Sequence, residues 1–289
     1  MDLLEKLQHI EDLPTIPTTL TRVMELTARE ETSAADLAKV INADQSVAVK
    51  VLKVANSAFF GLPRKISDLQ RAVTMLGFLQ VRDLCLGLSV FDSLFLPTKG
   101  AYFNRAKFWK HCYIVAHLTR EIARRTAGVE GGNAFAAGLL HDVGKVFLDR
   151  YFSALFRKIL EEVDLRQASF HEVEQELIGT GHEVIGAYLL SRWNLPDDLV
   201  AGVGGHHRPS GEPHPMAARV YLANWLAHAS GFSAMPSEPP IMLDEILVLP
   251  ETEMLRVDGR LPHIDVISRL FQELQTNSDE ISAHASMLM

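Results

Sequence analysis

The sequence predicts an all-α protein, for three reasons. Apolar residues recur at helical spacing through most of the 289 residues, and no series of alternating strands is found. An apolar content of 47% and a charged content of 22% are typical of a packed globular chain. Three segments begin with a serine followed three residues later by an acid or amide, the pairing that caps helix starts: Ser33 with Asp36, Ser67 with Gln70, and Ser169 with Glu172.

The first half of the chain is expected to fold into five helices. The apolar pattern places them at 15–30, after Ser33, at 47–56, after Ser67, and at 79–95. Gly77 is expected to end the fourth, because glycine readily adopts the left-handed conformation that closes a helix. The stretch LPTKG, residues 96–100, combines proline with glycine and is the expected internal boundary.

The second half is also expected to be helical, as far as residue 232. Its helices are predicted at 103–127, around GLLHDVGK (138–145), at 152–163, after Ser169, from His182, after Pro196 and at 216–229. Beyond residue 232 the pattern fades, and one helix is expected at 263–274. We therefore expect three parts: a helical subdomain at 1–98, a second at 99–232, and an extension at 233–289.

Charge and cysteine content narrow the class of protein. A net charge of −8 does not favour an electrostatic grip on nucleic acid, which needs clustered cations. Cys85 and Cys112 lie in apolar helical segments without a CxxC pattern, as expected of buried thiols in a reducing compartment. The chain start is acidic and amphipathic, unlike a signal peptide, and no apolar run is long enough to span a bilayer. We expect a cytoplasmic protein without a membrane segment.

Nine of the twelve histidines lie between residues 111 and 228, and His141 directly precedes Asp142 within the apolar GLLHDVGK. A carboxylate among leucine and valine needs compensation, either by a metal ion or by hydrogen bonds in a structural site left over from an enzyme. Adjacent side chains diverge on a helix, so we expect the pair near a helix end, where Gly138 and Gly144 permit close approach. Five histidines could converge on one ion: His111, His141, His182, His206 and His207.

Imidazole nitrogens combined with a carboxylate suit iron, manganese or zinc better than calcium or magnesium. Taken singly, a histidine on an amphipathic helix, such as His111 or His117, is more often a packed or surface residue. The pair His206-His207 follows two glycines near a helix end and is a stronger indication, with a polar loop as its alternative. The ordered set therefore carries more weight than any single member.

The order His111, His141-Asp142, His182, His206-His207 resembles the HD phosphohydrolase superfamily. The N-terminal half points to one branch, because three of its segments resemble the HDOD family, the HD-related output domains: LPTIPTTLTRVMEL (13–26), LAKVINADQSVAVKVLKVANSAFFG (37–61) and ISDLQRAVTMLGFLQVRDL (66–84). The resemblance covers most of the chain, up to the region of residue 230.

The resemblance implies a two-part helical bundle whose C-terminal part, 99–232, is HD-like, and a role in bacterial signal transduction. The chain has no room for a receiver domain, so a signalling protein partner would act in trans. Lys145, in HDVGK, matches the lysine of catalytic relatives and would contact phosphate. The metal ligands implied by the resemblance are His111, His141, Asp142, His182, His206, His207 and, weakly, Asn224.

The chain departs from the catalytic members at three places. Asn224, in LANWLA, stands where the superfamily has its last aspartate, and a neutral amide binds a cation less strongly. Lys107 stands where cyclic-dinucleotide hydrolases have a glutamate, and the GYP signature of those enzymes is missing. Because the two replacements remove negative charge, we expect one divalent metal (iron, manganese or zinc) rather than two.

These observations favour a regulatory signalling module, non-catalytic or weakly catalytic, with a partly retained metal site. The alternative is a metal-dependent phosphohydrolase or phosphodiesterase that acts on nucleotides or cyclic dinucleotides.

Two further surfaces of the N-terminal half are candidates for binding a partner. The turn NSAFFGLPRK could contact a protein partner, with core packing of its aromatic residues as the alternative; its key residues are Phe59, Phe60, Leu62, Arg64 and Lys65. Nucleic-acid binding is not favoured, since the number of basic residues in the N-terminal half is ordinary for solvated helices; these are Lys50, Lys53, Arg64, Lys65, Arg71 and Arg82.

Overall fold

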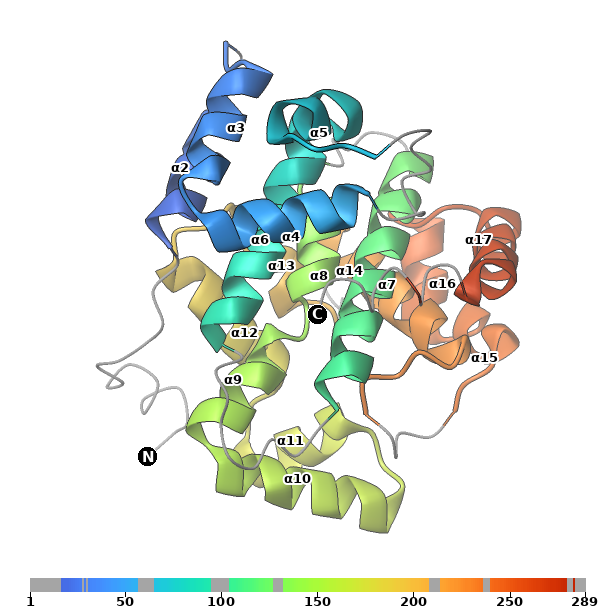
Figure 1. The fold of residues 1–289 in the computed structure, drawn as a ribbon. Helices are drawn as coiled ribbons and strands as arrows, with labels where there is room; N and C mark the ends of the chain where they lie inside the picture. The colour runs from blue at the N-terminus through green and yellow to red at the C-terminus, as the bar shows by residue number, and fades with distance from the viewer. Residues whose placement is uncertain are drawn as a thin grey trace. The chain divides into compact units, whose positions relative to one another are not determined.

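The computed structural model describes residues 17–27, 29, 31–56, 65–94, 104–126, 132–207, 214–235, 240–279 and 283. Within these residues all regular secondary structure is helical, which confirms the predicted all-α class (Figure 1). The chain contains two compact units, which we call the N-terminal unit, within Pro14–Leu96, and the C-terminal unit, within Pro97–Thr276. The three-part division expected from the sequence stays a prediction.

The N-terminal unit is built around one apolar helix. Helix α6 contacts each of the four helices before it, and the bounds are α2 Thr18–Thr27, α3 Ala34–Asn42, α4 Gln45–Ala55, α5 Leu69–Leu76 and α6 Phe78–Leu94. Each of the shorter helices buries one apolar stripe, as amphipathic spacing predicts. Their core side chains include Leu20, Val23, Leu37, Ile41, Val51, Val54, Leu69 and Val73.

Helix caps in this unit match the sequence in two cases and differ in one. Ser33 and Asp36 form the expected capping box at the start of α3. Gly77 ends α5 with a φ of 87°, as expected of glycine. The predicted cap at Ser67 is wrong: Asp68 caps α5, and its carboxylate accepts from the Arg71 N–H at 2.8 Å. A carboxylate is a stronger acceptor than a hydroxyl at the positive end of a helix.

Two sequence expectations for this half lie outside or at the edge of the described residues. The boundary LPTKG and residues 57–64 of the turn NSAFFGLPRK are outside them. Asn56, the first residue of this turn, makes two hydrogen bonds to Ile66. Its side-chain amide donates to the Ile66 carbonyl at 2.7 Å and accepts from the Ile66 N–H at 2.6 Å. No helix in the described part of the chain has the length and apolar character to cross a bilayer alone; α5 and Phe78–Val90 pass that test only as a pair bent by 117°.

The core of the C-terminal unit is formed by three mutually contacting helices, α7 Arg105–Arg125, α8 Ala134–Leu140 and α14 Pro215–Ala229 (Figure 1). Residues 111–116 of α7 are buried without a break, so neighbours cover this helix on all sides. The remaining helices around this core are α9 Val143–Tyr151, α10 Ser153–Arg166, α11 Phe170–Ile178, α12 His182–Arg192 and α13 Asp197–Gly204.

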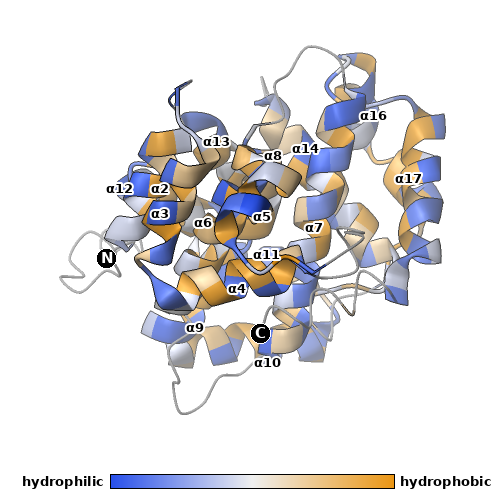
Figure 2. Ribbon diagram, turned by 45° about the horizontal axis from the view of Figure 1, so that its top comes forward, coloured by the Kyte–Doolittle hydropathy of each residue, from blue (hydrophilic) through white to orange (hydrophobic). Residues whose placement is uncertain are grey.

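The region after residue 232 contains more helix than the sequence predicted. Helix α17, Ile264–Thr276, matches the expected helix and packs on α7 through an apolar face that contrasts with its polar side (Figure 2). Two short helices were missed, α15 Leu243–Leu247 and α16 Pro250–Val257. Each is too short for a periodic signal, and Pro250 starts α16 at a position where proline is well tolerated.

Both cysteines are free and buried, as expected from their apolar context. Burial raises the pKa of the Cys85 thiol and of the Cys112 thiol, so neither thiolate is populated near neutral pH. The two side chains therefore act as small apolar groups in the core.

Two glycines set the spacing of the helices that flank the His141-Asp142 pair. A Cβ on Gly138 would lie 2.6 Å from the Ala116 Cα, and a Cβ on Gly144 would overlap the His182 carbonyl. Both obstacles are backbone atoms, which cannot rotate away. Glycine at these positions therefore lets α8 approach α7 and α9 approach α12.

We predict that Gly144→Ala lowers the free energy of unfolding by about 1–3 kcal/mol, because the added methyl group forces α9 away from α12. Urea unfolding followed by circular dichroism measures this change. Gly204→Ala is the control, since its added Cβ would meet only the Ala187 Cβ, at 3.1 Å. Equal stability of Gly144→Ala and the wild type would contradict the close-approach argument.

Candidate metal centre

The His141-Asp142 pair lies at a break between two helices. Helix α8 ends at Leu140 and α9 begins at Val143, so the two residues occupy the cap positions between them. Both side chains are completely buried. This confirms the expectation that the pair lies at a helix end, where adjacent side chains can face the same point.

The Asp142 carboxylate has polar neighbours at both oxygens. His182 Nε2 lies 2.9 Å and His206 Nε2 lies 3.7 Å from Oδ1. The neighbours of Oδ2 are Lys145 Nζ at 2.9 Å, His141 Nε2 at 3.4 Å and His111 Nε2 at 3.7 Å. The fifth expected histidine, His207, joins the Oδ1 side, with its Nε2 3.0 Å from that of His182. The structure thus brings together all five predicted histidines and Lys145.

The rings are oriented by contacts at their other nitrogen. In three of them Nδ1 faces a backbone carbonyl: Phe232 O at 2.6 Å from His111, Gly138 O at 2.8 Å from His141, and Val203 O at 2.6 Å from His206. A carbonyl only accepts, so Nδ1 carries the proton and donates it. In a neutral ring the lone pair is then on Nε2 and faces the centre, which is the form that binds a metal.

His182 is oriented by a carboxylate instead. Glu174 Oε2 accepts from the His182 backbone N–H at 3.0 Å and lies 2.6 Å from its Nδ1. Burial by itself would lower the pKa of His182, but Glu174 and Asp142 raise it to about 9. A histidine held between two carboxylates is a strong base, and a carboxylate on the second nitrogen is a frequent partner of metal-binding histidines.

Ring nitrogens of the cluster face one another across short distances. His111 Nε2 lies 3.1 Å from His141 Nε2, although the backbone carbonyls fix the proton of each ring on Nδ1. Among the described residues, His206 Nε2 has no hydrogen-bond partner of acceptable geometry. Two facing lone pairs repel unless a cation lies between them. Bonds of about 2.1 Å from zinc to nitrogen place tetrahedral ligands about 3.4 Å apart, close to the separations found here.

Electrostatics keep most rings of the cluster neutral, whereas His182, with its pKa raised to about 9, is protonated near pH 7 and would release a proton when a cation binds. Burial lowers the pKa of His141, His206 and His207, so these rings are neutral at pH 7. Burial opposes ionisation of Asp142, but His141, Lys145 and His182 together hold its pKa well below the usual range. Neutral imidazoles around an ionised carboxylate are the donor set of iron, manganese or zinc.

The donors form two groups that share Asp142. One ligand atom from each member lies within 4.8 Å of the others in the group Asp142, His182, His206 and His207, and likewise in the group His111, His141 and Asp142. The first group has four donors and the second has three. The residues present therefore fit one cation fully and a second cation only with help from another ligand.

A cavity of about 410 Å³ lies beside the cluster. Lys145 and Asn224 line it, together with His111 and His207. Asn224, expected as a weak ligand, thus borders the same space as three other predicted site residues. The remaining lining residues are Gln167, Ala168, Ser169, His171, Glu172, Trp225, His228 and Glu251.

The sequence analysis missed three residues next to the cluster: His171, Glu174 and Glu183. All three are buried. The signal was present on α11, where Phe170 and Val173 form the apolar face and His171 and Glu174 share it. A histidine and a glutamate on the buried side of an amphipathic helix need partners, and this could have marked them.

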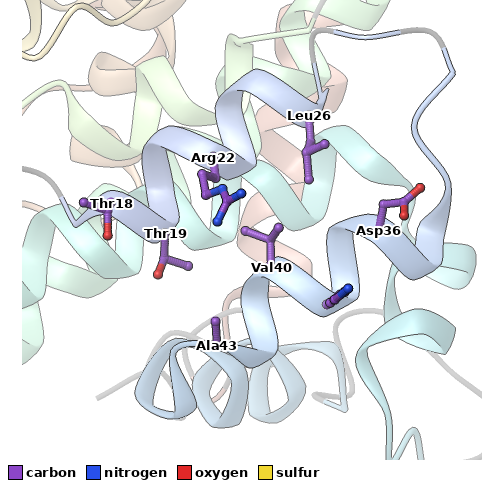
Figure 3. Close-up of a pocket in the computed structure, with 8 residues that line it drawn as sticks. Thr18, Thr19, Arg22, Leu26, Asp36, Val40 and Ala43 are labelled. Carbon is purple, nitrogen blue, oxygen red and sulfur yellow. The ribbon is translucent and has the colours of Figure 1, made fainter.

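The N-terminal unit has a second hollow, between α2 and α3, of about 460 Å³ (Figure 3). Leu26, Val40 and Ala43 give it an apolar floor, and Arg22 and Lys39 add positive charge. This groove is comparable in volume to the cavity beside Asp142, yet no histidine lines it. We therefore place the candidate reaction or ligand site at the histidine cluster, on chemistry rather than volume.

A helical unit in which histidines from separate helices meet an aspartate at a helix break defines a protein of the HD type. The chain belongs to the HDOD domain family, whose model matches residues 13–209. This agrees with the family that the sequence motifs resemble.

Solved structures and curated relatives agree with this assignment. An HDOD domain protein of unknown function from Geobacter sulfurreducens is 27% identical, with a TM-score of 0.84 over 99% of this chain and 96% of that one. A Shewanella amazonensis protein shares the fold at 24% identity, with a TM-score of 0.77 over 98% and 97%. An uncharacterized Treponema pallidum protein is 25% identical over 75% of this chain, but only 42% of its own length is covered. The chain thus spans less than half the length of the curated relatives it matches.

We predict that Lys145→Met strengthens binding of a cation at the group His111, His141 and Asp142 and destabilises the cation-free protein. The Lys145 ammonium lies 2.9 Å from Asp142 Oδ2 and competes with a cation for that oxygen. Its loss leaves the buried carboxylate with less compensation, which lowers the unfolding free energy of chelator-treated protein by about 1–3 kcal/mol. Titration calorimetry with Mn²⁺ or Zn²⁺ and thermal unfolding measure the two effects. Lys158→Met, on the exposed side of α10, is the control, and weaker metal binding by Lys145→Met would contradict the competition argument.

Proposed function

We propose that the chain is a regulatory signal-transduction module whose C-terminal unit holds one divalent cation at Asp142, His182, His206 and His207. The observation that carries this proposal is the group of four donors within 4.8 Å of one another, in which His206 Nε2, among the described residues, is buried without a hydrogen-bond partner. Iron, manganese or zinc suits this set.

The charge distribution supports one cation rather than two. Lys145 lies on Asp142 Oδ2, the oxygen that His111 and His141 would share with a second ion. Asn224 lines the cavity next to Lys145, and its neutral amide adds no negative charge there. The second position is therefore poor in negative charge, and a cation there is held weakly.

A site of this kind binds a phosphate-containing ligand more readily than it hydrolyses one. The cation, Lys145 and the Asn224 amide border the cavity and can together hold a phosphoryl group. Hydrolysis by metal pairs needs two ions that stabilise both the attacking and the leaving oxygen. With one ion the expected outcome is ligand binding with slow or no turnover. The bound state would then be reported to a signalling protein partner in trans.

The names of two structural relatives are consistent with a signalling role and with a phosphate-containing ligand. The Shewanella amazonensis protein carries a provisional assignment as a phosphohydrolase, and a Marinobacter aquaeolei protein of the same fold carries one as a signal transduction protein.

We predict that Asp142→Asn lowers the metal content of the purified protein by one ion per chain, because Asp142 is the carboxylate common to both donor groups. Elemental analysis after loading with iron, manganese and zinc measures the ratio. Asp258→Asn removes the same charge from an exposed turn and should change nothing. Equal metal content in the wild type and Asp142→Asn would refute the proposed cation site.

The second candidate function is a metal-dependent phosphohydrolase acting on nucleotides or cyclic dinucleotides. The second donor group, His111, His141 and Asp142, favours it, because one further carboxylate would complete a two-ion centre.

We predict that Asn224→Asp adds one bound cation per chain and raises phosphoester turnover at least tenfold, since it places a carboxylate beside the three-donor group. The measurements are elemental analysis and a hydrolysis assay on nucleotides, a cyclic dinucleotide and an aryl phosphate. Asn194→Asp adds the same charge on the exposed turn after α12 and is the control. Efficient turnover by the unmodified chain would instead favour the enzyme over the regulatory module.

A further inference from the structure

Beyond the Asp142 groups, α11 and α12 bring three more buried polar side chains together. His171 and Glu174 lie one turn apart on α11, and Glu183 lies in the first turn of α12. Their exposed fractions are 8%, 0% and 6%. One ligand atom from each, and one from His182, lie within 4.8 Å of one another. We call these three residues the His171–Glu174–Glu183 cluster; Glu174 faces His182 Nδ1, whereas Asp142 faces its Nε2.

The cluster contains more acceptors than donors. Among the described residues, four of its atoms have no hydrogen-bond partner: both ring nitrogens of His171, Glu183 Oε2 and Glu174 Oε1. His182 satisfies only Glu174 Oε2, through its Nδ1 and its backbone N–H. Buried unpaired carboxylate oxygens are costly, and His182, whose two nitrogens face Glu174 and Asp142, has no further donor for Glu174 Oε1 or for Glu183.

A simple histidine–carboxylate pair does not account for the cluster. His171 Nδ1 lies 3.3 Å from Glu183 Oε2, which would make one such pair. Even with that bond formed, Glu174 Oε1 and the second nitrogen of His171 stay unsatisfied. The plane of the His171 ring is set by stacking on His207, with centroids 4.3 Å apart and planes 8° from parallel. A flip of the ring within this stack exchanges its two edges but leaves at least one nitrogen without a partner among the described residues.

We propose that His171, Glu174 and Glu183 bind a further divalent cation. A nitrogen 3.3 Å from a carboxylate oxygen matches the separation of about 3.4 Å between two ligands of one tetrahedral zinc. Glu174 bridges the two sites, with Oε2 on His182 and Oε1 on the further cation. One nitrogen and two carboxylates suit zinc, manganese or iron(II).

The cation can reach this site, since His171 lines the 410 Å³ cavity, whose water would complete its coordination. Gly181 leaves room for the Glu183 carboxylate, which would overlap a Cβ at that position. The inference does not rest on the proposed function, because Asp142, His206 and His207 are not donors to this cation.

Metal content of single and double variants of the 289-residue chain tests the site. The probes are Zn²⁺ and Mn²⁺ alone, and the readouts are the metal-to-protein ratio and a calorimetric titration. We expect Glu183→Gln and His171→Ala each to lose one ion relative to the wild type. Asp142→Asn should keep that ion, and Asp142→Asn with Glu183→Gln should lose it as well. Glu176→Gln, on the exposed side of α11, should leave the ratio unchanged.

The outcomes separate this inference from the proposed function. A folded Asp142→Asn protein whose remaining ion is lost on adding Glu183→Gln supports the further site. Unchanged ratios in folded Glu183→Gln and His171→Ala overturn it, whatever Asp142→Asn does. If Asp142→Asn loses nothing while Glu183→Gln loses one ion, the further site stands and the cation at Asp142 does not. Circular dichroism and thermal unfolding establish that each variant is folded.

Discussion

The buried Asp142 carboxylate is the constraint on which the C-terminal unit depends. An ionised carboxylate with no exposure to water is stable only if surrounding groups compensate its charge. Here the compensation comes from four helices or their ends: Lys145 on α9, His111 on α7, His182 on α12 and His206 after α13. Each of these groups must be held at a fixed distance from Asp142, so the packing of the helices determines the chemistry of the site.

Backbone geometry supplies that fixed distance. The break between α8 and α9 turns His141 and Asp142 toward one point, and Gly144 lets α9 approach the start of α12, where His182 lies. Backbone carbonyls then orient the rings from behind, so that rotation of a side chain does not decide which nitrogen faces the centre. The ring nitrogens of the cluster are thus held in place by the backbone in the absence of a ligand.

The charges beside Asp142 Oδ2 bear on whether the cluster suits a regulatory module or a two-metal enzyme. On the Oδ1 side the donors are complete. On the Oδ2 side Lys145 occupies the carboxylate and Asn224 is neutral, so the second cation of a hydrolase has little to hold it. Helices α11 and α12 also carry His171, Glu174 and Glu183 next to His182, which extends the buried polar cluster beyond the ligands implied by the family. The number of cations that the cluster can hold therefore depends on the charges of a few side chains around Asp142.

The sequence by itself determined the helical class, most helix positions, the capping of α3 and α11, and the set of histidines around Asp142, because these depend on local spacing and on residue type. It could not determine which ring nitrogen faces the centre, since that depends on carbonyls such as Phe232 O, 121 residues from His111. It also missed α15, α16 and the role of Glu174. Periodicity reports which face of one helix is buried, whereas only packing between helices decides which buried groups meet.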